Sequence, residues 1–186
     1  MVIVDFNNPH EFQGFDQGED ILVDTGILLA LASSHDPWHE TVKELFDNYI
    51  FPEGELILLY TNPLVVNEVL HLSTRSLKNF TERFGIMFSD ADRHDLEAFI
   101  ENMLTIFIEE GILKVLEGDK NSVLHQIKLK KHLGAADAAN ASLANLYGTN
   151  FLTVDNILKN NMVKAEEILP NIKKVYYTTP LHMTYR

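Results

Sequence analysis

The stretch DILVDTGILLAL, residues 20–31, decides how the chain is organised. Ile21, Leu22 and Val23 form a short apolar run of the kind that becomes a buried strand. A carboxylate, Asp24, ends this run, and the apolar residues that follow Gly26 are compatible with a helix. Because ligands of open parallel sheets bind where strands pass into the following loops, an acidic residue at this point is a candidate functional group.

The composition fits one domain with a substantial core, because 46% of the 186 residues are hydrophobic. There is no cysteine, which excludes disulfides and thiolate chemistry and is compatible with a cytoplasmic location. The net charge of −12 argues against a general nucleic-acid binder, but not against a nucleic-acid enzyme whose acidic residues surround metal ions. The N-terminus lacks a basic segment, and no apolar run is long enough for a bilayer. We therefore expect no signal peptide, no membrane segment and a soluble protein.

Apolar runs alternate with helical patterns along the rest of the chain. Strands are predicted at 20–24, 55–61, 112–118, 150–155 and 173–179. This alternation predicts a single three-layer α/β domain with a central parallel sheet of about five strands and helices on both faces. We expect residues 1–19 to be an extension with little regular structure, residues 20–179 to form the domain, and residues 180–186 to be a tail.

Several helix ends carry local signals. Asp36–Pro37 and Asn62–Pro63 each combine a capping residue with proline at the first helical position. Ser89 and Asp92 resemble a capping box, which predicts a long amphipathic helix ending near Gly111. Two further helices are predicted to end at glycines, and these glycines are Gly134 and Gly148.

Four carboxylates are candidates for one shared site. Asp24 and Asp155 each end a predicted strand, so both emerge at the same edge of the sheet. Glu68 lies in the helix after the second strand, within reach of that edge. Asp137 lies in the first turn of an alanine-rich helix, whose small side chains allow a close approach to the sheet.

Carboxylates gathered in one place repel one another and raise one another's pKa values. A hard divalent cation relieves this repulsion, and oxygen ligands with open water positions suit Mg²⁺ or Mn²⁺. Such a metal activates water and neutralises charge on a phosphate under attack.

The order of these motifs resembles the PIN domain family, in the compact form of the VapC-type toxin ribonucleases. The matching segments are ILVDTGILLAL, TNPLVVNEVL, GAADAANASLA and FLTVD. The resemblance implies a metal-dependent endoribonuclease that hydrolyses RNA phosphodiester bonds, with Asp24, Glu68, Asp137 and Asp155 as catalytic and metal-binding residues. In the toxin branch it also implies an antitoxin partner, a homodimer and a cytoplasmic location.

Other polar residues have secondary roles in this interpretation. Thr25, Asn140 and Thr153 are candidates for supporting the carboxylates or contacting a ligand. Basic residues near the acidic helices are candidates for contacting RNA phosphates, and these are Arg75, Lys128, Lys130 and Lys131. The aromatic residues Trp38, Tyr147 and Phe151 are interpreted as core residues.

Two alternatives remain open. A PIN scaffold that binds RNA or protein without turnover would be distinguished by testing for metal-dependent cleavage. A phosphatase with an aspartyl nucleophile at Asp24 is disfavoured, because Gly26 stands where enzymes of the haloacid dehalogenase type place a second aspartate. Glu68 and His71 have the E-x-x-H spacing of di-iron ligands, but the second copy that a bundle needs is absent from the sequence.

Overall fold

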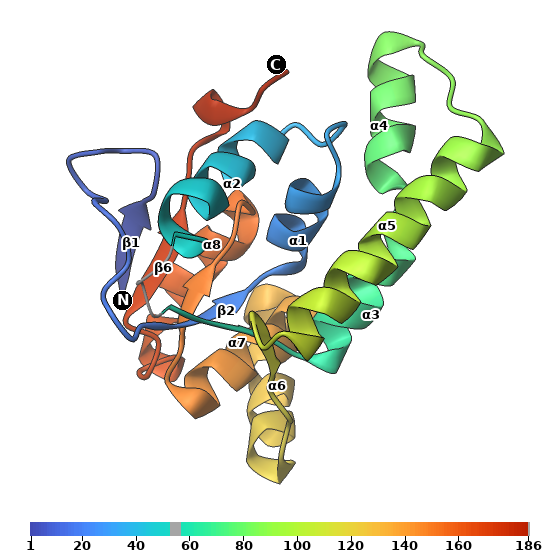
Figure 1. Cartoon of the computed structure of the whole chain (residues 1–186). Helices are drawn as coiled ribbons and strands as arrows, with labels where there is room; N and C mark the ends of the chain where they lie inside the picture. The colour runs from blue at the N-terminus through green and yellow to red at the C-terminus, as the bar shows by residue number, and fades with distance from the viewer. Residues whose placement is uncertain (53–56, 186) are drawn as a thin grey trace.

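The strand that precedes Asp24 lies in the middle of a six-stranded sheet in the computed structural model, which describes residues 1–52 and 57–185 (Figure 1). Every pair of neighbouring strands is parallel, in the order β1-β6-β5-β2-β3-β4. The strands are β1 (Val2–Asp5), β2 (Asp20–Val23), β3 (Leu58–Thr61), β4 (Leu113–Val115), β5 (Asn150–Leu152) and β6 (Lys174–Tyr177).

Helices cover both faces of the sheet, as the sequence predicts. They are α1 (Thr25–Ala32), α2 (His39–Leu45), α3 (Pro63–His71), α4 (Arg75–Phe84), α5 (Asp90–Glu109), α6 (Lys120–Leu133), α7 (Ala135–Tyr147) and α8 (Asn156–Lys164). A π-helical turn, Phe46–Ile50, follows α2, and short 3₁₀ turns occupy Glu166–Ile168 and Pro180–His182.

Alternation along β2 divides the core into two layers. Ile21 and Val23 pack with residues of α1, α2, α3 and α5 on one face. Leu22, between them, points to the opposite face and packs with residues of α6, α7 and α8. A strand buried on both faces in this way reads as a continuous apolar run, which is why DILV identifies the centre of the sheet.

The expectation of little regular structure over residues 1–19 is wrong. Val2–Asp5 form β1, which pairs with β6 and adds a strand to the five that the sequence predicts. Phe6, Phe12 and Phe15 are buried in the core, and the ring centroids of Phe12 and Phe15 lie 5.0 Å apart. Where the domain should be divided from an extension and a tail stays a prediction.

The local signals at helix ends are confirmed at Asn62, Ser89, Gly134 and Gly148. After Asp36–Pro37 the helix begins later than predicted, at His39, because the Asp36 carboxylate instead accepts the backbone N–H of Trp38 at 2.9 Å. The strand predicted over residues 55–61 is seen from Leu58, and residues 55–56 lie outside the described residues.

The segment over residues 77–111 forms most of α4 and all of α5. Figure 1 shows α4 and the adjoining end of α5 projecting away from the sheet. Within the described residues, no helix is both long and apolar enough to cross a membrane.

Candidate active site

The structure places the four predicted carboxylates on or next to the expected elements. Asp24 stands between β2 and α1, and Asp155 caps α8 shortly after β5. Glu68 is in α3, which follows β3, and Asp137 is in the first turn of α7. The strands β2, β3 and β5 are adjacent and parallel, so the elements that follow them begin at one edge of the sheet.

Asp24 is the most deeply buried of the four, with 7% of its surface exposed. The hydroxyl of Thr153 donates a hydrogen bond of 2.7 Å to its Oδ2 atom. Burial raises the pKa of Asp24 to about 7, and the negative charges of Asp137 and Asp155 add to this effect. The hydrogen bonds from Thr153 and from the backbone of Thr25 oppose it without cancelling it.

Asp137 responds to the same set of charges. Burial raises its pKa to about 6, and the carboxylates of Asp155 and Glu68 contribute to the increase. Because Asp24 interacts with Asp137 and Asp155, and Asp137 interacts with Asp155 and Glu68, the four carboxylates share one electrostatic environment.

Two threonines hold individual carboxylates in position. Thr25 donates a hydrogen bond of 2.7 Å to Oε2 of Glu68. Thr153 contacts Asp24, and its hydroxyl also accepts the backbone N–H of Asp155 at 2.9 Å. Asp155 Oδ1 in turn accepts the backbone N–H groups that begin α8, at 2.7 and 2.9 Å. Three of the four carboxylates, Asp24, Glu68 and Asp155, are therefore oriented by hydrogen bonds.

Asn140 is fully buried one turn after Asp137, and it contacts Asn62 rather than a carboxylate. Asn62 Nδ2 donates to Asn140 Oδ1 at 3.0 Å, while Asn62 Oδ1 accepts the N–H groups that begin α3. These bonds determine the orientation of both amides. The Nδ2 atom of Asn140 consequently remains buried without a hydrogen-bond partner among the described residues, and it is a donor available to a carboxylate, water or ligand.

The donor set fits a hard divalent cation, although the described side chains do not enclose one as they stand. Across residues 1–52 and 57–185, no three His, Asp or Glu side chains are arranged so that they could hold a metal ion. The chemistry nevertheless fits: the candidate ligands are all carboxylate oxygen atoms, and two of the carboxylates have raised pKa values that a cation would lower. Asp24, Glu68, Asp137 and Asp155 are the residues that could hold Mg²⁺ or Mn²⁺.

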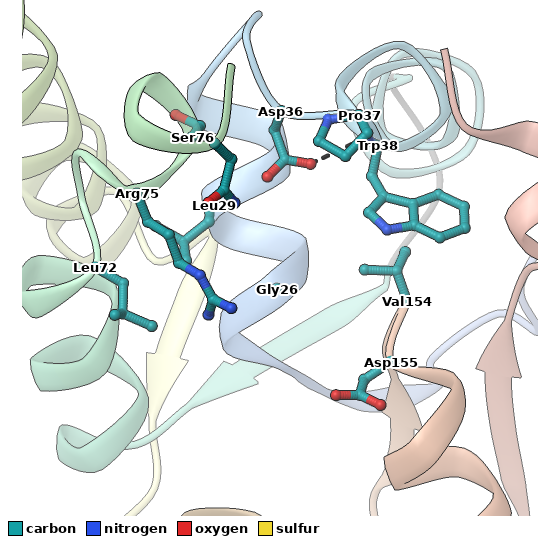
Figure 2. A pocket seen from close by; sticks show the side chains of 11 residues that line it. Gly26, Leu29, Asp36, Pro37, Trp38, Leu72, Arg75, Ser76, Val154 and Asp155 are labelled. Atoms are coloured by element: carbon teal, nitrogen blue, oxygen red, sulfur yellow. Dashed lines mark hydrogen bonds between the residues drawn. The ribbon is translucent and has the colours of Figure 1, made fainter. Parts of the chain in front are cut away.

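A pocket of about 270 Å³ opens beside Asp155. Figure 2 shows Arg75 and Asp155 on different sides of it, with Asp36 and Trp38 completing the rim. Arg75 is one of the predicted phosphate contacts. The other three, Lys128, Lys130 and Lys131, are exposed on α6 and do not line this pocket.

Of the three aromatic residues that were interpreted as core residues, Phe151 agrees with this interpretation and the other two differ from it. Phe151 is buried as predicted, whereas Tyr147 is 49% exposed, and its hydroxyl donates to the carbonyl of Glu117. Trp38 is half-buried: it packs against the core and also lines the pocket. The Asp36–Pro37 pattern predicts only a helix cap, and the one sequence signal for a pocket there is a carboxylate two residues before the single tryptophan.

A parallel sheet covered on both faces places this protein in the class of open α/β proteins, which as a class bind ligands at the carboxyl edge of the sheet. The sequence matches the PIN domain family over residues 21–164, and the chain belongs to that family. PIN domains are generally nucleases and generally need divalent metal ions. The predicted resemblance is therefore confirmed.

Three solved structures are similar to this chain. FitAB bound to an IR36 DNA fragment is 15% identical, with a TM-score of 0.53, and covers 89% of this chain and 99% of its own. FitAcB from Neisseria gonorrhoeae is 14% identical, with a TM-score of 0.50, and the match covers 88% of this chain and 99% of the FitAcB chain. VapBC2 from Rickettsia felis, bound to a promoter DNA fragment, is 11% identical, with a TM-score of 0.49, and the match covers 85% of this chain and 98% of the VapBC2 chain. Comparison with curated proteins finds no significant match.

Proposed function

We propose that the protein is a metal-dependent endoribonuclease that hydrolyses RNA phosphodiester bonds. The observation that carries this proposal is the electrostatic coupling of Asp24, Asp137, Asp155 and Glu68 at one edge of the sheet. Such a concentration of negative charge opposes folding unless a cation neutralises it.

Asp24, Asp137 and Asp155 would hold Mg²⁺ or Mn²⁺, with Glu68 completing the set. When bound, the ion supplies an acidic water and neutralises charge on the phosphate. The protein's own residues prepare the site: Thr153 and Thr25 orient Asp24 and Glu68. Because the pKa values of Asp24 and Asp137 are raised to about 7 and about 6, these carboxyls are partly protonated near neutral pH, Asp24 more than Asp137, and a cation displaces those protons.

The exposed cations are suited to the RNA backbone. Arg75 lines the pocket beside Asp155, and Lys128, Lys130 and Lys131 lie on α6, immediately before the helix that carries Asp137. We assign these residues to phosphate contacts, which position a substrate without reading its sequence.

Resemblance to the VapC-type toxins supports a more specific role. The protein would act in the cytoplasm as the toxin of a toxin–antitoxin pair, as a homodimer, with an antitoxin that masks the acidic site. FitAB and FitAcB share its fold, and co-purification with the product of a neighbouring small reading frame tests this role.

Incubation with total RNA and Mn²⁺ tests the chemistry. We expect wild-type protein to cut RNA with Mn²⁺ and not with EDTA. Asp137→Asn should lower the rate by about 100-fold or more, since loss of a supporting residue alone reduces metal-site function by about 10- to 100-fold. Asp95→Asn, which alters an exposed carboxylate of α5, is the matched control. Metal-dependent binding of RNA without cleavage would favour the alternative of a scaffold without turnover.

A further inference from the structure

Arg75 places a positive charge in the lining of the pocket beside Asp155. The exposed guanidinium of Arg75 makes no hydrogen bond or ion pair to another side chain within the part of the chain that the structure describes. Burial raises the pKa of Asp36 across the pocket, and the charge of Arg75 is one of the smaller effects that oppose this rise. An unpaired guanidinium close to a phosphodiester-cleaving site suits a phosphate group of the substrate.

Trp38 forms another wall of the same pocket. Asp36 Oδ1 accepts the backbone N–H of Trp38 at 2.9 Å, and the Trp38 side chain packs partly against the core, so the indole is held in place. Figure 2 shows the indole next to Val154 and on the side of the pocket away from Arg75. Aromatic walls of this kind bind unstacked bases of single-stranded RNA, because every base has an apolar face.

Asp36 supplies a group that can distinguish among bases. Its carboxylate lies at the rim of the pocket in Figure 2, and only one of its oxygen atoms bonds the backbone of Trp38. An ionised carboxylate only accepts hydrogen bonds. Among the four RNA bases, guanine alone presents two adjacent donors, N1–H and the N2 amino group, on one edge.

We propose that this pocket binds a guanine nucleotide adjacent to the scissile phosphate of single-stranded RNA, with the guanine edge on Asp36, its face on Trp38 and its phosphate on Arg75. The volume of about 270 Å³ is slightly below the roughly 300–1,000 Å³ typical of small-ligand sites, so the pocket suits one nucleotide rather than a nucleic-acid helix. The assignment rests on the proposed ribonuclease function, because Asp155 belongs both to the pocket and to the acidic set.

Binding can be measured without catalysis, because Trp38 is the only tryptophan in the chain. In EDTA, the trinucleotides UGU, UAU, UCU and UUU are titrated while Trp38 fluorescence is followed. We expect UGU to change the fluorescence and to bind at least about 10-fold more tightly than the others, the discrimination typical of a bidentate contact. Replacing its guanine with inosine, which lacks the N2 amino group, should weaken binding several-fold, whereas 7-deazaguanine should bind as guanine does.

Variants assign the contacts. Asp36→Asn keeps the oxygen that accepts the Trp38 N–H but removes the charge, so we expect the preference for UGU to disappear. Arg75→Ala should weaken binding of all four trinucleotides by about 10-fold. Lys78→Ala removes a charge from the same helix, outside the pocket, and should have little effect. Circular dichroism confirms folding, and the inosine comparison requires no variant.

Equal binding of the four trinucleotides, equal binding of guanine and inosine, or a guanine preference that survives Asp36→Asn would overturn the pocket assignment. The same oligonucleotides with Mn²⁺ separate this result from the proposed function. Cleavage without guanine preference contradicts the pocket assignment alone. Guanine-selective binding without cleavage supports the pocket and contradicts the ribonuclease.

Discussion

At the residue scale, Asp24 is a carboxylate that folding removes from water and places among other negative charges. Its pKa rises from 3.8 to about 7. The folded state therefore binds more protons than the unfolded state between these values, and stability falls as pH rises. The penalty is absent below about pH 4, grows through neutral pH, and reaches about 4 kcal/mol at most for a shift of this size.

We therefore expect Asp24→Asn to flatten the pH dependence of stability in EDTA. At pH 8 the variant should be more stable than wild type by roughly 1–4 kcal/mol, because the amide carries no charge to bury. At pH 4 the two proteins should be nearly equal. Urea unfolding across this range gives both curves, and parallel curves would show that Asp24 is not buried among negative charges.

Thr153 is the second informative residue, because its hydroxyl serves two carboxylates. It donates to Asp24 and accepts the backbone N–H of Asp155. Thr153→Val keeps the shape but leaves both partners unsatisfied, so we expect a loss of roughly 1–3 kcal/mol in the free energy of unfolding. Thr153→Ser preserves the hydroxyl and should lower the free energy of unfolding by less than Thr153→Val does. If urea unfolding shows the Thr153→Val variant to be as stable as the Thr153→Ser variant, these hydrogen bonds do not contribute to stability.

At the scale of elements, the helix starts at Asn62–Pro63 and Ser89–Asp92 followed local signals, whereas the helix after Asp36–Pro37 began later than predicted and strand ends were not predicted. Asn62–Pro63 and Ser89–Asp92 mark α3 and α5 because a cap bonds residues only two or three positions away. The strand predicted over residues 150–155 ends at Leu152, and α8 was not among the predicted helices. An apolar run does not show where pairing with a distant strand stops, and a single capping aspartate leaves turn and helix open.

Two caps should differ in strength because of their surroundings. Asn62 is buried and also binds Asn140, whereas the cap formed by Ser89 is exposed. We expect Asn62→Ala to lower the free energy of unfolding by about 2 kcal/mol or more, since it removes a cap and leaves Asn140 without a partner. Ser89→Ala should lower it by about 1 kcal/mol. Equal losses in urea unfolding would show that the contact between the two asparagines contributes nothing.

At the scale of the whole molecule, the N-terminal segment shows the limit of reading local sequence. The segment contains Gly14 and Gly18 and many polar residues. Its strand nevertheless pairs with β6, at the other end of the chain. No local sequence pattern identifies β6 as the partner of β1. The burial of Phe12 likewise depends on a distant residue, because its ring packs against Tyr176 with the ring centroids 5.8 Å apart.

This packing predicts that the first residues stabilise the whole domain. Phe12 is 4% exposed in the main core cluster. We expect Phe12→Ala to lower the free energy of unfolding by about 3 kcal/mol or more. Phe99→Ala, which truncates a side chain that is 53% exposed on α5, should change it by less than about 1 kcal/mol. Thermal unfolding compares the two, and a small effect at Phe12 would mean that the segment is not part of the cooperative fold.

The candidate site was predictable to the extent that it lies where strands end. Asp24 and Asp155 follow strands of one parallel sheet, so their common edge follows from topology. The pocket could not be predicted, because Trp38, Arg75 and Asp155 come from separate segments whose approach depends on how α4 packs. The four carboxylates could therefore be predicted from the sequence pattern, whereas the pocket could be found only in the folded structure.

Calorimetric titration with Mn²⁺ at pH 7, in two buffers of different ionisation enthalpy, tests most directly whether the four carboxylates form one cation site. Wild type should bind Mn²⁺ and release protons, because Asp24 and Asp137 have pKa values of about 7 and about 6 without metal. Asp24→Asn and Asp137→Asn should each weaken binding strongly, whereas Asp95→Asn should not. Failure of the wild type to bind Mn²⁺, or equal binding by all four proteins, would contradict a shared cation site.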